Sequence, residues 1–346
     1  MPKRWKNRPQ GSNWGEFGDD DALGRMNLLT EERRLRAVKE VKAGRAFCLS
    51  HPLDRPGGNV LNASRFAPVF HPVQRDGQVY FNLDFQRLDP RFTDVGSDEA
   101  VMLYTQYSTH WDGFPHKGSL FDADGDSVPE KVFYNGYRIV DAAGRGSQGD
   151  LGAVALGIQG MAETGVQGRG VMIDLRHHLG DERVEVGFDR LEMIMKVDGV
   201  RVEKGDIVCI HTGLGQLIRD AAGKLDPSIR RACAVLDGYD KRLLEWIADS
   251  GLAAIASDNL AVERSSTLGA DPRLASPRAG AAAARALPVQ AGDPSGRAVV
   301  PDRARRVAAS APPQRLPADR AAAAAARRGR FSGHTCCHGV TGVTQA

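Results

Sequence analysis

Residues 206–211 read Asp-Ile-Val-Cys-Ile-His, a short apolar run whose length and composition predict a buried β-strand. Residues 171–175 and 252–256 are similar runs. Helical patterns of apolar side chains occupy the intervals between these runs, at residues 188–197 and 227–248. Strands that alternate with helices in this way predict an α/β architecture.

The N-terminal part of the chain contains one more predicted helix. Thr30 is a suitable N-cap, and Glu31 and Glu32 place negative charge in the first turn, where the helix dipole favours it. We expect this helix to end near Gly44, because glycine is a common helix terminator.

Length, composition and cysteine usage are those of an ordinary cytoplasmic protein. The chain has 346 residues, of which 42% are hydrophobic and 26% are charged. It has no run of about 18 apolar residues that would predict a membrane span, and its basic start is not followed by the apolar run of a secretory signal. The five cysteines are few and irregularly spaced, which favours free thiols in a reducing cytoplasm.

The net charge of +3 is unevenly distributed along the chain. Residues 264–346 hold thirteen Arg and four Asp with no Lys or Glu, so residues 1–263 carry an excess of six negative charges. The part with a foldable composition is therefore mildly acidic, and we expect no nucleic-acid partner.

The residues with the clearest chemistry lie at 106–116, which read Gln-Tyr-Ser-Thr-His-Trp-Asp-Gly-Phe-Pro-His. Residues 101–107 are apolar and strand-like. Alternate residues of an extended strand face the same side, which predicts that Gln106, His110 and Asp112 lie in a row. Imidazole nitrogen and carboxylate oxygen together suit Zn²⁺ or Mn²⁺.

A turn after Asp112 extends this predicted cluster. Gly113 and Pro115 can turn the chain and bring His116 back toward the same point. Two His and one Asp so close in sequence also have a simpler interpretation, in which they are polar groups that satisfy one another at the end of a strand.

Residues 109–116 resemble the signature HxGTHxDxPxH of the cyclase family, which includes kynurenine formamidase and isatin hydrolase. The residues that match this signature are Thr109, His110, Asp112 and His116. Gln106 stands where many members have a first His, Ser108 replaces the Gly, and Pro115 lies one position late. The resemblance covers roughly residues 10–263.

The resemblance implies a swivelling β/β/α fold, usually assembled as a homodimer, and hydrolysis of an amide. The small-molecule substrate would be a formamide such as N-formylkynurenine, or a cyclic amide. Because the first His is missing, we expect a single divalent ion held by His110, Asp112 and Gln106, with His116 as the base that takes a proton from water. A later His and Glu complete the metal site in the family, and the chain lacks them.

Three further residues are expected to contact the substrate. Trp14 belongs to a tryptophan-glycine segment that resembles one wall of the family's pocket, although it can equally be a core residue. Phe114 could supply a second apolar wall for an aromatic substrate. Asp258 follows a buried-strand pattern, and loops in that position often carry function.

Other function classes fit the sequence less well. No GxSxG motif of a serine hydrolase occurs. Residues 144–149 match GxGxxG in letters, but they open a turn-rich stretch instead of joining a strand to a helix. The aspartates of residues 122–126 are spaced as in a calcium loop, but that loop would lack its Gly at position six and its final Glu.

Residues 264–346 differ abruptly from the rest of the chain. They contain no Ile, Met, Asn, Lys, Glu, Tyr or Trp and a single Phe, while Ala, Arg and Pro dominate. Such a composition can be a natural disordered tail. We therefore divide the chain into a cyclase-like hydrolase domain, residues 1–263, and a loose tail, residues 264–346.

A shifted reading frame accounts for this tail more fully. Codons can be chosen for residues 287–303 so that the neighbouring frame spells CLFKLGIPLGELWYLTE. In the same way, residues 316–338 can encode FLLTAPPLRLPGAVGSPATPVAT. Both recovered sequences resemble the usual C-terminal part of the family, so we infer that the frame slips near Glu263 or Arg264. The alternative to an active enzyme is then an inactive relative, or a truncated product that acts at most as a binding protein.

Sequencing the gene across codon 263 tests this inference directly. We expect the neighbouring frame to continue the family sequence from that codon, so that one inserted or deleted base restores it. A gene whose neighbouring frame is interrupted by stop codons, or encodes nothing similar to these sequences, would contradict the inference.

Overall fold

The computed structural model describes residues 3–139, 155–264 and 343–344. By its internal contacts the chain divides into two compact units, and every described residue belongs to the first, residues 1–292 and 339–346. Most of the expected loose tail lies outside the described residues. Two of its residues, β13 (Val343–Thr344), are described as a short strand.

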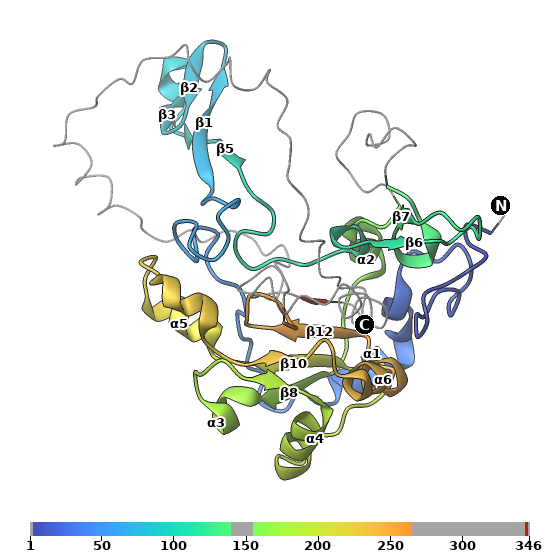
Figure 1. The fold of residues 1–346 in the computed structure, drawn as a ribbon. Coiled ribbons are helices and arrows are strands. Elements are labelled where there is room, and N and C mark those ends of the chain that lie inside the picture. The colour runs from blue at the N-terminus through green and yellow to red at the C-terminus, as the bar shows by residue number, and fades with distance from the viewer. Residues whose placement is uncertain (1–2, 140–154, 265–342, 345–346) are drawn as a thin grey trace. The chain divides into compact units, whose positions relative to one another are not determined.

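A parallel sheet forms the centre of the fold (Figure 1). Its parallel strands are β8 (Gly170–Asp174), β10 (Ile207–His211) and β12 (Ala254–Ser257), and β13 pairs antiparallel with β12. The strand order is β13-β12-β10-β8. The three predicted strands are confirmed, and so is the mixed α/β architecture.

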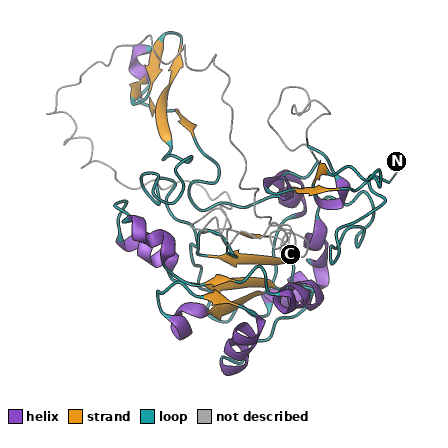
Figure 2. Ribbon diagram, viewed as in Figure 1, coloured by secondary structure: helices purple, strands orange, loops and turns teal. Residues whose placement is uncertain are grey.

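Helices follow strands β8 and β10 and separate the three parallel strands, as the alternating pattern predicts (Figure 2). They are α3 (Leu175–Leu179), α4 (Phe188–Val197), α5 (Leu214–Asp220) and α6 (Lys241–Ser250). The bounds of α4 are those predicted from the sequence. No helix in the described part of the chain is long and apolar enough to cross a membrane.

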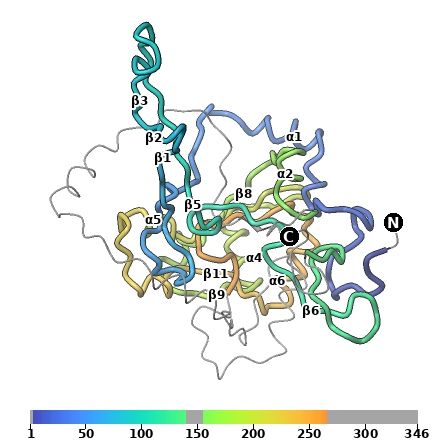
Figure 3. The backbone as a smooth tube through the Cα atoms, turned by 90° about the horizontal axis from the view of Figure 1, so that it is seen from above, coloured from blue at the N-terminus to red at the C-terminus, as the bar shows by residue number. Residues whose placement is uncertain are grey.

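The helical pattern predicted over residues 227–248 is wrong in its first half. A short 3₁₀ helix, η6 (Pro227–Arg231), is followed by β11 (Val235–Leu236), which pairs in parallel with β9 (Glu185–Val186), as Figure 3 shows. Cys233 adopts a positive φ of 63°, and its backbone N–H donates to the Asp181 carbonyl. A helix cannot continue through this conformation, so α6 begins only after Asp240 caps it.

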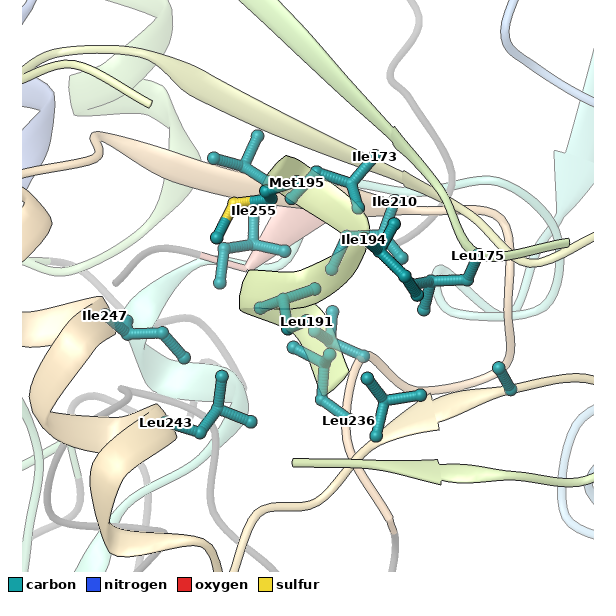
Figure 4. Packing of buried hydrophobic residues seen from close by; sticks show 14 of the residues in the cluster. Ile173, Leu175, Leu191, Ile194, Met195, Ile210, Leu236, Leu243, Ile247 and Ile255 are labelled. Atoms are coloured by element: carbon teal, nitrogen blue, oxygen red, sulfur yellow. The ribbon is translucent and has the colours of Figure 1, made fainter. Parts of the chain in front are cut away.

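The main hydrophobic core lies between one face of this sheet and helices α4 and α6 (Figure 4). Ile173, Ile210 and Ile255 come from the three parallel strands, and Ile194 and Ile247 come from the two helices. All five side chains are buried. Since burial of each large aliphatic side chain contributes about 1.5–3 kcal/mol, this cluster is the main source of stability for the sheet.

A second hydrophobic cluster contacts the same sheet through smaller side chains, with Ala254 and Ala256 of β12 as members. Residues distant in sequence meet in it, among them Trp5, Trp14 and Phe114. This cluster joins the N-terminal segment to the residues around Asp112, and it thereby positions the predicted chemical segment against the sheet.

The remaining strands form small antiparallel sheets. One has three strands in the order β2-β1-β5 and the other two are pairs. Their strands are β1 (Val69–Arg75), β2 (Gln78–Tyr80) and β5 (Glu99–Met102), then β3 (Leu83–Asp84) with β4 (Val95–Gly96), and β6 (Ser119–Phe121) with β7 (Glu130–Val132).

The predicted N-terminal helix is confirmed as α1 (Glu31–Val38), and the Thr30 side chain caps it by accepting a hydrogen bond from Arg33 N. It ends at Val38, earlier than the expected end near Gly44. The remaining helices are α2 (Ile158–Thr164) and the 3₁₀ helices η1 (Gly24–Leu28), η2 (Phe85–Arg87), η3 (Phe114–His116) and η4 (Tyr134–Gly136).

The strand predicted over residues 101–107 is largely absent. Strand β5 ends at Met102, and the chain then turns, with Tyr107 N donating to the Tyr104 carbonyl. The Tyr107 ring is buried, and its hydroxyl accepts from Gly57 N and donates to the Gly58 carbonyl. Because these contacts fix a turn, strand alternation does not align the residues of the chemical segment.

A buried arginine connects η1 to the end of α6. The Arg25 guanidinium donates to the carbonyls of Ile247 (2.9 Å) and Leu252 (3.5 Å), and also to that of Ala248. Arg25→Ala should lower the free energy of unfolding by about 2–4 kcal/mol, because it leaves buried carbonyls without donors. Urea unfolding measures this change, with Arg45→Ala at an exposed position as the control. Equal losses in the two variants would contradict a structural role for Arg25.

Candidate active site

The chemical segment is held in place by the loop that precedes β1. Ser108 Oγ donates to the Pro52 carbonyl (2.9 Å), and Thr109 Oγ1 accepts from His51 N (2.9 Å). After Asp112, Gly113 opens η3, and His116 N donates back to the Gly113 carbonyl (3.0 Å). This tight turn returns His116 toward Asp112.

Asp112 lies between two imidazoles. Its Oδ1 atom is 3.3 Å from His110 Nε2 and 3.8 Å from His116 Nδ1. The same oxygen is buried and has no hydrogen-bond partner of good geometry. An unpaired buried carboxylate oxygen costs several kcal/mol, so a cation beside it would be strongly favoured.

The tautomer of His110 is set by the backbone. Its Nδ1 lies 2.7 Å from the Ser108 carbonyl oxygen, which can only accept a hydrogen bond. The proton of neutral His110 is therefore on Nδ1, and the Nε2 lone pair faces Asp112. Metal-ligating histidines are commonly oriented in this way, through a carbonyl that holds the other ring nitrogen.

Burial and charge shift the three side chains in different directions. Burial lowers the pKa of His110, but the contact with Asp112 outweighs it and the pKa is raised. Burial raises the pKa of Asp112, but His110 and His116 outweigh it, so this pKa is lowered and the carboxylate stays ionised. Burial also lowers the pKa of His116, and Asp112 offsets this only in part. His116 is therefore a neutral base at pH 7.

Two further charged residues lie near this cluster, and both were missed in the sequence. Arg65 donates to the Gln106 carbonyl (2.8 Å), and its positive charge acts on Asp112. Glu263 is 7% exposed, its Oε2 has no hydrogen-bond partner, and its charge interacts with Asp112. Nothing in the sequence around Arg65 marks it, whereas Glu263 could have been noticed as an acidic residue that ends an apolar run.

Gln106 is linked to the group formed by His110, Asp112 and His116 through its backbone carbonyl and Arg65, and its side chain has another partner. Its side-chain Oε1 accepts from the hydroxyl of Thr105 (2.9 Å), while its carbonyl accepts from Arg65. The structure thus brings together His110, Asp112 and His116, and it gives the amide of Gln106 a different partner.

Trp14 and Phe114 both lie in the second hydrophobic cluster. Trp14 is 6% exposed and packs edge-on against Trp5 and Phe121. Phe114 is 4% exposed and stacks on Tyr134, with ring centroids 4.4 Å apart. Both residues therefore have packing roles. Phe114 is the first residue of η3, so its burial also fixes the turn that carries His116.

Asp258 stabilises the turn between β10 and α5 through hydrogen bonds. Its Oδ1 accepts from the backbone N–H (2.6 Å) and the hydroxyl (2.8 Å) of Thr212, and its Oδ2 accepts from Gly213 N (2.9 Å) and Gly215 N (3.3 Å). Gly213 has a φ of 95°, a left-handed conformation that favours glycine. The carboxylate is thus saturated by donors of its own chain.

Comparison with known proteins identifies the family. Residues 47–264, more than half of the chain, match the family model named Cyclase. The chain belongs to the cyclase family. It is similar to a crystal structure of a novel cyclase, with 27% sequence identity, a TM-score of 0.56, and coverage of 73% of this chain and 77% of that one. No curated protein matches it.

Cyclase-family proteins usually depend on a metal, and the donor set around Asp112 fits one. It offers two imidazoles, a buried carboxylate oxygen without a hydrogen-bond partner, and, when His110 is neutral, an Nε2 lone pair that faces that oxygen. A second set of donors also exists. Among the described residues, Asp122, Asp124 and Asp126 are the one group of three or more acidic, imidazole or thiol side chains whose ligand atoms all lie within 4.8 Å of one another.

The acidic group is explained by the loop that contains it. Asp122 accepts from Gly125 N and Ser127 N, Asp124 from Asp126 N, and Asp126 from Val128 N. Each carboxylate therefore already has a backbone donor; Asp126 is exposed, and Asp122 and Asp124 are half-buried. In contrast, Asp112 Oδ1 is buried without such a donor.

Glu263 allows a test of the electrostatics around Asp112. Burial raises its pKa to about 7, from an ordinary value of 4.5. Since the folded state favours the protonated form, the protein should lose up to about 3 kcal/mol of stability as the pH rises from about 5 to 8. Glu263→Gln should not show this loss, so the stability advantage of this variant over the wild type should grow with pH.

Urea unfolding at several pH values measures the effect of Glu263→Gln, with Glu99→Gln at an exposed strand position as the control. The control should follow the wild type at every pH. A constant difference between Glu263→Gln and the wild type across the pH range would show that Glu263 is ionised throughout.

Proposed function

We propose that this cyclase-family protein is a metal-dependent hydrolase of an amide bond. The observation that carries the proposal is the buried Asp112 Oδ1, which lies between His110 and His116 with no hydrogen-bond donor of its own. The imidazole nitrogen of His110 and the carboxylate oxygen of Asp112 are ligand types that suit a divalent transition-metal ion, Zn²⁺ or Mn²⁺.

His110 and Asp112 would hold the ion, with Gln106 as a third ligand if its amide rotates away from Thr105. When bound, the ion supplies Lewis-acid chemistry, polarising a carbonyl oxygen and lowering the pKa of water. The Ser108 carbonyl keeps the proton of neutral His110 on Nδ1, which leaves the lone pair of Nε2 available to bind the ion. Arg65 adds positive charge beside the site and helps to keep Asp112 ionised.

His116 is the proposed general base. It is neutral at pH 7 because burial lowers its pKa, and its side chain is 27% exposed, so water can reach it. A ring nitrogen of His116 would accept a proton from the attacking water and deliver it to the leaving nitrogen. Asp112, 3.8 Å away, would stabilise the imidazolium that forms between these two transfers.

The proposed substrate is a small amide, either a formamide of the N-formylkynurenine type or a cyclic amide. The family resemblance supports this class, and it would make the protein an arylformamidase of tryptophan catabolism. From the same resemblance we propose the swivelling β/β/α arrangement and a homodimer. The free cysteines and the acidic composition of residues 1–263 support a cytoplasmic protein without nucleic-acid partners.

A catalytically inactive relative, or a truncated product, is the second candidate. One observation favours it: the family match ends at residue 264, where the composition changes. The later His and Glu that complete the family's metal site are missing from the chain as written. Assays of this chain beside a frame-restored version distinguish the candidates, because an inactive chain with an active restored version supports this second one.

The role of His116 can be tested by kinetics. We expect hydrolysis of N-formylkynurenine to be lost after dialysis against a chelator and regained with Zn²⁺ or Mn²⁺. His116→Ala should lower kcat by about 100-fold or more while the bound metal is retained, because a general base contributes about that factor. His71→Ala, at an exposed position of β1, is the matched control and should leave kcat unchanged.

Two results would contradict this mechanism. The first is full turnover by His116→Ala that still binds metal. The second is activity that survives complete removal of metal, which would leave the donor set around Asp112 without a catalytic role.

A further inference from the structure

A cavity of about 200 Å³ opens at the carboxyl ends of strands β10 and β12, where His211 and Ser257 are the last residues. Ligands of open α/β sheets bind beyond this end of the strands. Figure 1 shows β10 and β12 side by side at this edge, next to α5. The site proposed for hydrolysis is centred on other residues, since neither His110 nor Asp112 lines this cavity.

The floor of the cavity is apolar. Met172, Cys209 and Ala256 are directly opposite one another on neighbouring strands, so their side chains form a row across one face of the sheet. All three line the cavity, and Met172 is 53% exposed although it belongs to a strand of the central sheet. Met172 is the most exposed member of the row, since Ala256 is buried and Cys209 is half-buried, and together they give a ligand in the cavity an apolar contact surface.

The walls supply positive and hydrogen-bonding groups. Arg219 comes from α5, His51 from the segment before β1, and His211 from the end of β10. Within the described part of the chain, the Arg219 guanidinium forms no ion pair or hydrogen bond. It is nevertheless close enough to His51 to lower the pKa of that imidazole, after burial, which has the larger effect.

The acidic residues around the cavity already have hydrogen-bond partners within the protein. Both oxygens of Asp258 accept hydrogen bonds from the turn at residues 212–215. Asp174 Oδ1 lies 2.8 Å from His211 Nδ1, which leaves Nε2 of His211 as the free ring nitrogen, 3.9 Å from Asp258 Oδ2. Arg219 is therefore the cation of this wall that has no protein partner among the described residues, and its exposed guanidinium is available to an anion.

We propose that this cavity binds a small organic acid, with its carboxylate at Arg219 and His51 and its apolar body on the Met172–Cys209–Ala256 row. A guanidinium pairs with a carboxylate through two parallel hydrogen bonds, and the row excludes water from the opposite end of the ligand. The volume suits a single small ring, since drug-sized ligands need about 300–1,000 Å³. An inorganic anion would leave the apolar row unused.

A hydrogen bond donated by the backbone connects the cavity to the proposed hydrolase site. His51 lines the cavity, and its backbone N–H donates to the hydroxyl of Thr109, next to His110. Binding itself needs no metal and no turnover, so the inference stands or fails separately from the proposed hydrolysis.

Isothermal titration calorimetry of the full-length chain tests the inference, with benzoate, acetate and benzamide as probes. Benzoate should bind at least about tenfold more tightly than acetate, which lacks the apolar body, and than benzamide, which lacks the charge. Arg219→Gln should weaken benzoate binding at least about tenfold, without disturbing the fold, because Arg219 is on the exposed side of α5. Arg190→Gln, which removes the same charge from an exposed position of α4, should leave it unchanged.

A second measurement locates the bound acid. Cys48 and Cys209 are free thiols that line the cavity, so bound benzoate should slow their alkylation by iodoacetamide, as followed by peptide mass spectrometry. Benzoate that does not bind, binds equally to Arg219→Gln, or leaves both alkylation rates unchanged would overturn the proposal. Binding of acetate as tightly as benzoate would also overturn it, because the apolar row would then have no function.

Discussion

The buried carboxylate of Asp112 is the constraint on which the candidate site depends. Its Oδ1 atom is withdrawn from water and has no good hydrogen-bond donor, while an imidazole lies on each side of it. Burying such a charge without compensation costs several kcal/mol, and the rest of the fold must sustain that cost. The second hydrophobic cluster does so, because Phe114 and Trp111 pack into it on either side of Asp112.

The sequence predicts the central sheet well because burial determines it. The three parallel strands are apolar on both faces, and α4 carries an apolar stripe of helical period, so each pattern has one structural interpretation. Prediction failed where long-range contacts override the local pattern. Tyr107 is held in a turn by hydrogen bonds to Gly57 and Gly58. Strand β11 forms because it pairs with β9. In both cases the partner is distant in sequence, so the local pattern does not reveal it.

The candidate site was predicted in the same uneven way. The approach of His116 to Asp112 follows from the turn at Gly113, which is local. The effect of Arg65 and Glu263 on Asp112 could not be predicted, because both act through space on a residue distant in sequence, although the position of Glu263 after an apolar run could have drawn attention to it. Asp258 shows a further limit of sequence reasoning: a carboxylate after a buried strand is a common functional pattern, yet here four hydrogen bonds commit it to shaping the turn before α5.

The most direct test of the account is the zinc content of three proteins after loading with Zn²⁺ and desalting, measured by inductively coupled plasma mass spectrometry. The wild type and Asp124→Asn should each retain one equivalent of zinc, whereas Asp112→Asn should lose it. Retention of zinc by Asp112→Asn together with its loss from Asp124→Asn would move the metal to the acidic loop and contradict the account.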